Sequence, residues 1–97
     1  MTAALTLTAT FRVKPGTQAE AAAWMTSLLE PVRAEDGCIA YDLYIAADDP
    51  ESFMFFEIWR DQAAVEAHMK AAPFLEFAAR SPEFIEGAPA LSFYTKN

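Results

Sequence analysis

Residues 53–68 have the sequence Phe-Met-Phe-Phe-Glu-Ile-Trp-Arg-Asp-Gln-Ala-Ala-Val-Glu-Ala-His, which predicts a β-strand that leads directly into an amphipathic helix. Side chains alternate along a strand, so this one has two faces, the first made of Phe53, Phe55, Glu57 and Trp59 and the second of Met54, Phe56 and Ile58. Both faces are apolar. A strand of this kind must be covered on both sides.

Glu57 is the exception within this apolar segment. A buried carboxylate is costly unless it has a partner or stays protonated. Glu57 is therefore a candidate for chemistry, and the alternative is a structural salt bridge with Arg12, Arg33 or Arg60, within the chain or across a dimer.

Composition limits the classes of function. The chain has 97 residues, which we interpret as one domain over residues 1–97, and a net charge of −7 that argues against binding to nucleic acid or to anionic membranes. No apolar run approaches the ~20 residues that cross a bilayer, and the N-terminus alternates like a strand, unlike a signal peptide, so we expect a cytoplasmic protein. With one cysteine and one histidine, we expect no metal cluster.

The remaining elements follow from periodicity. Residues 4–13 alternate with period two and predict the first strand. Thr17 and Glu20 match a capping box that opens a helix, and Pro31 is expected to distort its last turn. The apolar stripe of this helix consists of Ala21, Trp24, Met25, Leu28, Leu29 and Val32.

The second half of the chain continues in the same way. Residues 38–45 predict a strand with a continuous apolar face of Ile39, Tyr41, Leu43 and Ile45, and residues 46–52 predict a turn. Asp61 can cap a helix that carries Ala64, Val65, His68 and Ala72 on one face until Pro73 interrupts it. A short helical turn over residues 74–78 and a last strand over 90–95 complete the chain.

The predicted order is strand, helix, strand, strand, helix, strand. This order is typical of an α+β, ferredoxin-like split βαβ fold, with an antiparallel sheet and helices on one of its faces. The helices suffice for one sheet face only. We therefore expect a second copy of the chain to cover the other, giving a homodimeric α+β barrel.

Five short segments resemble, in order and spacing, the antibiotic biosynthesis monooxygenase family: residues 35–43, Asp49-Pro50, Phe53-x-x-x-Glu57-x-Trp59, Ala64-x-x-x-His68 and Phe74. The resemblance implies a homodimer with a pocket between sheet and helices, in which members oxidise quinols or polyketide aromatics with O₂ and without metal or flavin. Haem-degrading relatives use an asparagine on the first strand, whereas the only asparagine here is Asn97 and the window 8–10 offers hydroxyls at most. Haem chemistry is therefore disfavoured.

The candidate catalytic residues are His68 and Glu57. His68 would deprotonate a phenol or hydroquinone, whose anion can pass an electron to O₂, and Glu57 would orient the imidazole or hold a proton. The candidates for binding a small aromatic substrate are Trp59 as a stacking platform, Phe55, Tyr41 and Phe74. His68 could instead be a core histidine, satisfied by Glu57 or a carbonyl. An isomerase of the same fold and a non-enzymatic dimer that binds aromatic ligands are the alternative functions.

Overall fold

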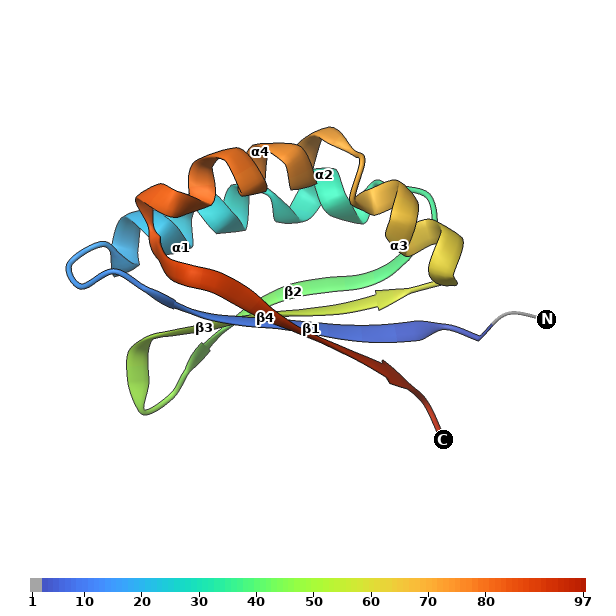
Figure 1. Ribbon diagram of the computed structural model, residues 1–97, viewed down its shortest axis with the longest axis horizontal. Helices are drawn as coiled ribbons and strands as arrows, with labels where there is room; N and C mark the ends of the chain where they lie inside the picture. The colour runs from blue at the N-terminus through green and yellow to red at the C-terminus, as the bar shows by residue number, and fades with distance from the viewer. Residues whose placement is uncertain (1–2) are drawn as a thin grey trace.

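The computed structural model describes residues 3–97, in which one layer of helices covers one face of a four-stranded antiparallel sheet (Figure 1). The elements are β1 (Leu5–Val13), α1 (Gln18–Ser27), α2 (Leu29–Arg33), β2 (Cys38–Ala46), β3 (Asp49–Trp59), α3 (Gln62–His68), α4 (Ala72–Arg80), a 3-10 turn (Ser81–Glu83) and β4 (Ile85–Thr95). The predicted order and the α+β, ferredoxin-like fold are confirmed.

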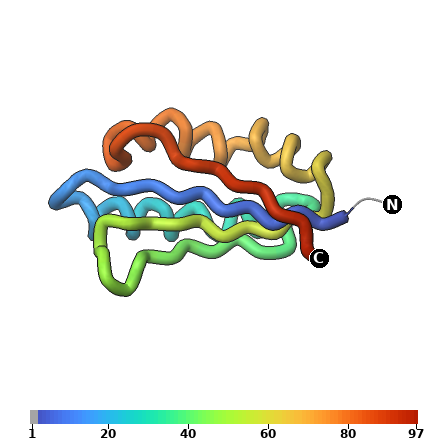
Figure 2. The backbone as a smooth tube through the Cα atoms, turned by 60° about the horizontal axis from the view of Figure 1, so that its bottom comes forward, coloured from blue at the N-terminus to red at the C-terminus, as the bar shows by residue number. Residues whose placement is uncertain are grey.

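The strands lie in the order β2-β3-β1-β4, so the two central strands come from distant parts of the sequence (Figure 2). β3 pairs with β1 over residues 52–59 and with β2 along its whole length. Over residues 52–59, β3 has a neighbour on each edge, so this part of its backbone lies inside the sheet, and its side chains point alternately toward the helices and away from them.

The face of β3 that points toward the helices is the first of the two predicted faces, the one that contains Glu57. Phe53, Phe55 and Trp59 are almost completely buried, and Glu57 is buried among them. Met54, Phe56 and Ile58 are half-buried and face away from the helices. The register places Thr6, Thr8 and Thr10 of β1 and Ala90, Ser92 and Tyr94 of β4 on that same uncovered face.

Three expectations about the strands are wrong. The predicted turn over 46–52 shrinks to residues 47 and 48, because Ala46 already pairs with Asp49. The predicted apolar face of β2 is discontinuous, since the pairing register shifts between Cys38 and Ala40 and leaves Ile39 61% exposed. β4 also begins before residue 90, at Ile85.

The helices differ from expectation at their ends. The capping box does not form, because the Thr17 hydroxyl donates to the carbonyl of Lys14 and accepts no hydrogen bond from the amides of the first turn of α1. The first helix divides into α1 and α2 at Leu28. Pro31 has no N–H for the carbonyl four residues earlier, which explains a break one turn before it. No helix in residues 3–97 is long and apolar enough to cross a membrane.

The helix after β3 is shorter than predicted. Asp61 does cap α3, accepting a hydrogen bond from the amide of Ala64 at 2.9 Å. The helix ends at His68, so Ala72 does not share its face and instead begins α4, with Pro73 in the first turn. Pro73 therefore starts a new helix of nine residues where a short turn was expected.

Gly37 lies in the loop between α2 and β2, where it packs against α3. Its φ of +88° lies in the left-handed region, and a Cβ atom at this position would lie 2.5 Å from the Cβ of Ala64. The Gly37 carbonyl also accepts a hydrogen bond from the amide of Arg60 at 2.8 Å, directly after β3. The absence of a side chain thus lets the loop that carries Glu35 lie against the helix that carries His68.

We predict that Gly37→Ala destabilises the fold by about 3 kcal/mol, since the left-handed backbone and the overpacking against Ala64 each cost about 1–2 kcal/mol. Gly16→Ala is the matched control, because Gly16 has a φ of +83° but open space around the position of a Cβ, and we expect a loss of about 1 kcal/mol. Urea unfolding of both variants measures the difference. Equal losses would contradict close packing at Gly37.

Candidate active site

A cavity of about 330 Å³ lies between the helix-facing side of the sheet, the α3–α4 segment and the start of β4. Its walls are mostly apolar and aromatic, which is typical of sites for small organic ligands. The lining residues are Leu7, Ala9, Tyr41, Phe55, Glu57, Val65, His68, Met69, Phe74, Phe77, Ala78, Ser81, Gly87, Ala88, Pro89 and Leu91.

His68 reaches this cavity from the last turn of α3. Its side chain is only 4% exposed, and it packs between aromatic rings. The ring centroids of Trp59 and Phe74 lie 4.5 and 5.4 Å from that of the imidazole, and the ring of Tyr41 lies 5.8 Å away. These contacts restrict the orientation of the imidazole plane.

The hydrogen-bond partner of His68 is Glu35, which the sequence analysis did not select. The Nδ1 atom of His68 lies 2.9 Å from Oε1 of Glu35, and the Glu35 side chain is 16% exposed. Neither Glu57 nor a carbonyl fills this role among the described residues, so both partners named in the core-histidine alternative are wrong. A signal was present, because Glu35 opens the segment 35–43 that resembles the family, but the sequence alone offered no reason to assign Glu35 a role of its own.

Glu57 projects into the same cavity from β3. Its Oε1 atom accepts a hydrogen bond of 2.9 Å from the indole N–H of Trp59. Burial raises the pKa of Glu57 from 4.5 to about 7, and the nearby charge of Glu35 acts in the same direction, against the opposing effect of the indole hydrogen bond. The carboxyl group is therefore substantially protonated near neutral pH.

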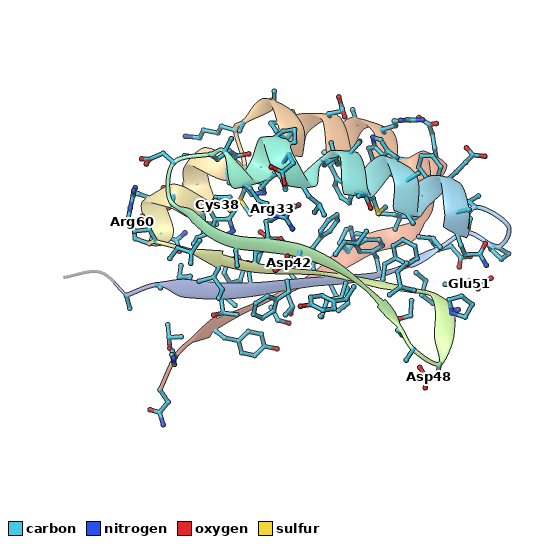
Figure 3. All side chains as sticks on the ribbon, turned by 180° about the vertical axis from the view of Figure 1, so that it is seen from behind. Arg33, Cys38, Asp42, Asp48, Glu51 and Arg60 are labelled. Atoms are coloured by element: carbon cyan, nitrogen blue, oxygen red, sulfur yellow. The ribbon has the colours of Figure 1, made fainter. Side chains whose placement is uncertain are left out.

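The three arginines suggested as partners of Glu57 form ion pairs elsewhere. Arg12 binds Asp49 and Glu51 near the β2–β3 hairpin, Arg33 binds Glu30 and Asp42, and Arg60 binds Asp36 and Asp61. Figure 3 shows Arg60 at one end of the molecule, Glu51 at the other, and Arg33 with Asp42 between them. The intrachain salt bridge offered as an alternative for Glu57 is therefore wrong.

The four aromatic candidates divide into two groups. Tyr41, Phe55 and Phe74 line the cavity, with the rings of Tyr41 and Phe55 stacked at 5.1 Å. Burial strongly raises the pKa of Tyr41, so its hydroxyl stays a neutral donor. Trp59 is completely buried and is not among the lining residues. Its indole contacts His68 and Glu57, and so supports the two groups without presenting a face to the cavity.

The atoms that face the cavity can be inferred from the hydrogen bonds. Among residues 3–97, the single buried side-chain oxygen or nitrogen without a partner is Oε2 of Glu35. We find no hydrogen bond to Nε2 of His68, Oε2 of Glu57 or the hydroxyl of Tyr41 within that part of the chain, yet none of these atoms is sealed off. All three residues line the cavity, so we infer that these atoms are presented to it.

The first strand contributes little polarity to the site. Of the window 8–10, Ala9 alone lines the cavity, because Thr8 and Thr10 pair with Phe56 and Met54 and share their uncovered face. Within the described residues, no three histidine, cysteine, aspartate or glutamate side chains gather closely enough to hold a metal ion. The groups that can act on a ligand are thus an imidazole, a raised-pKa carboxyl and a phenol.

The fold and the site together define a small α+β protein with an apolar cavity that contains proton-handling side chains. The family model described as Antibiotic biosynthesis monooxygenase matches residues 4–80. This chain therefore belongs to that family, and the predicted membership is confirmed.

This chain is also similar to individual proteins and solved structures. "Putative monooxygenase Rv0793" of Mycobacterium tuberculosis is 33% identical over 85 residues, covering 88% of this chain and 83% of the relative. "Uncharacterized protein sll1783" of Synechocystis is 36% identical over 83 residues, which cover 86% of this chain but only 56% of that longer protein. The crystal structure of PA3566 from Pseudomonas aeruginosa matches with a TM-score of 0.91 at 32% identity, covering 100% of this chain and 97% of that one.

We predict that the raised pKa of Glu57 makes stability depend on pH. The folded state holds the Glu57 proton more tightly than the unfolded state, so the free energy of unfolding falls as pH rises from 4.5 through about 7. Between pH 5 and pH 8 this loss amounts to roughly 2–3 kcal/mol. Glu57→Gln keeps an acceptor for the indole of Trp59 but cannot ionise. Denaturant unfolding should therefore show a smaller fall for the variant, and equal falls would contradict a buried, raised-pKa carboxyl.

Proposed function

We propose that this protein is a cofactor-independent monooxygenase that oxidises a hydroquinone or a related aromatic with O₂. The observation that carries the proposal is the presence of His68 and Glu57, with open polar atoms, in one aromatic-lined cavity of about 330 Å³. A passive apolar pocket has little need for two titratable groups in its wall. Membership of the monooxygenase family supports the same reaction type.

His68 is proposed as the base. Nε2 would take a proton from a phenolic hydroxyl, because an imidazole suits proton transfer near neutral pH. The resulting phenolate is rich in electrons and can reduce O₂ by one electron, which leaves a semiquinone radical and superoxide. These two radicals combine to form a carbon–oxygen bond, and the product is a ring peroxide.

The second half of the proposed reaction needs a proton donor. The imidazolium first returns its proton to the peroxide anion, which becomes a hydroperoxide. The neutral imidazole then takes the ring C–H proton while the O–O bond breaks, which forms a new carbonyl group and expels hydroxide. A proton from the imidazolium or from the neutral carboxyl of Glu57 converts the hydroxide to water, and in the second case the imidazolium restores the proton of Glu57. The balance is one hydroquinone and one O₂ giving one hydroxyquinone and one water, and no external reductant is needed.

The other candidate residues are proposed to hold the ring. The hydroxyl of Tyr41 would donate to a substrate oxygen, and the faces or edges of Phe55 and Phe74 would contact the ring. Trp59 acts behind the cavity, where its indole N–H holds Glu57 and its ring packs on His68. Its proposed role is therefore to orient these two groups and not to stack on the substrate.

A homodimer is also part of the proposal. The uncovered sheet face has an apolar centre of half-buried Met54, Phe56 and Ile58, flanked by Tyr44 and Tyr94, which are 52% and 54% exposed. On the adjoining strand β1, this face carries Thr6, Thr8 and Thr10. Arg12 and Asp42 of this face are paired within the chain, and Glu86, which lies opposite Arg12, is exposed near the start of β4 and away from the apolar centre. Two copies can therefore meet over the apolar centre without burying unpaired charge, despite the net charge of −7.

We predict that His68→Ala lowers the rate of O₂ consumption with a hydroquinone or anthrone substrate by about 10²–10⁴-fold, since the variant loses the proposed base. An oxygen electrode and product analysis measure the effect across a panel of such substrates. Glu66→Ala, on the exposed side of the same helix, is the control and should leave the rate unchanged.

Three results would overturn the monooxygenase proposal. The first is a wild-type protein that consumes no O₂ above background with any of these compounds. The second is a His68→Ala variant with unchanged activity. The third is turnover at the same rate without O₂, which would instead indicate an isomerase in which His68 and Glu57 move a proton.

We predict that Phe56→Glu converts a dimer into a monomer, because it places a charge at the centre of the uncovered sheet face. Light scattering at micromolar concentration measures the mass. Leu75→Glu is the matched control, since Leu75 is an exposed apolar residue of α4, and it should leave the dimer intact. A monomeric wild-type protein would remove the basis of the dimer proposal.

A further inference from the structure

Glu35 is separated from His68 by 33 positions in the sequence, yet the two side chains form a largely buried pair. The contact joins Oε1 of Glu35 to Nδ1 of His68 at 2.9 Å, with exposed fractions of 16% and 4%. Glu35 is not among the residues that line the cavity. It therefore touches the proposed base from behind and acts on a substrate only through that base.

We propose that Glu35 is the positioning residue that fixes the tautomer of His68, accepting its Nδ1–H so that the Nε2 lone pair faces the cavity. The catalytic consequence rests on the proposed function, in which Nε2 is the base. The tautomer itself does not, because it is a property of the resting protein.

The hydrogen-bonding chemistry of the two side chains determines which nitrogen of His68 carries the proton. A neutral imidazole carries one N–H, on either Nδ1 or Nε2, and an ionised carboxylate can only accept. With Glu35 ionised, the contact at Nδ1 is satisfied when Nδ1 carries the proton, which leaves Nε2 as the basic nitrogen. When Nε2 then takes a proton from a substrate, the resulting imidazolium is paired with the carboxylate, and this favours the proton transfer.

The other neighbours of His68 cannot set the tautomer. Trp59, Phe74 and Tyr41 pack on the imidazole through their rings. Glu57 uses Oε1 to accept from the indole of Trp59, and no hydrogen bond joins it to His68 in the described part of the chain. The aromatic rings thus hold the plane of the imidazole, and Glu35 alone supplies an acceptor at Nδ1.

The position of Glu35 does not serve stability well. Its Oε2 atom is buried without a partner. Burial raises the pKa values of Cys38, Tyr41 and Glu57, and the charge of Glu35 raises them further. A carboxylate held in such an unfavourable place is typical of a residue retained for a site.

The composition of the chain makes a direct test simple. His68 is the only histidine, so ¹⁵N NMR of histidine-labelled protein reports on this one imidazole without assignment. We expect the neutral wild-type side chain to be predominantly the Nδ1–H tautomer. Glu35→Ala should shift the population toward Nε2–H. Glu35→Gln keeps an acceptor oxygen without the charge, and it should retain more of the Nδ1–H form than Glu35→Ala.

Glu30→Gln is the matched control, because Glu30 lies on α2 nearby and is exposed to solvent. It should leave the tautomer unchanged. A wild-type spectrum dominated by Nε2–H would overturn the proposal, as would an unchanged tautomer in a folded Glu35→Ala variant. The wild-type spectrum alone decides the matter if that variant does not fold.

Kinetics then separate this inference from the proposed function. If Glu35 positions the base, Glu35→Ala should lower kcat with a hydroquinone by about 10–100-fold, with KM nearly unchanged. The expected tautomer without any O₂-dependent turnover would support the positioning role and overturn the proposed reaction. Turnover with kcat unchanged in Glu35→Ala would overturn the positioning role and leave the proposed reaction standing.

Discussion

The structure depends on the position of β3, which is paired on both edges and carries apolar side chains on both faces. Backbone pairing fixes which side chains point toward the helices, so Phe55, Glu57 and Trp59 must lie beneath α3 and α4. A shift of one residue would put the indole and the carboxyl on the uncovered face. The same register that builds the core therefore also delivers Glu57 to the cavity and leaves Phe56 for the opposite surface.

Hydrogen bonds link the buried polar side chains next to the cavity. Trp59 connects the two candidate catalytic groups, since its N–H binds Glu57 while its ring packs on His68. Glu35 completes the arrangement on the far side of the imidazole. Two carboxyl groups and one imidazole thus share a poorly solvated region, where burial and the charge of Glu35 both raise the pKa of Glu57. Such an arrangement is unfavourable for packing alone, and it fits a site that moves protons.

The solved structure of PA3566 keeps this fold although about two thirds of the aligned residues differ from those of this chain. The cavity is built largely from the α3–α4 segment and the start of β4, where the side chains decide its shape and polarity.

The sequence by itself determined the order of elements, the two faces of the strand over 53–59, the capping of α3 by Asp61 and the family, because these depend on local periodicity and short motifs. It also singled out His68 and Glu57 as unusual residues in an apolar setting. The pairing of Glu35 with His68, the bond between Trp59 and Glu57, and the withdrawal of Trp59 from the cavity wall were decided by the tertiary structure alone. These contacts depend on the angle at which α3 crosses the sheet and on the close approach of Gly37 to Ala64, which no spacing along the chain specifies.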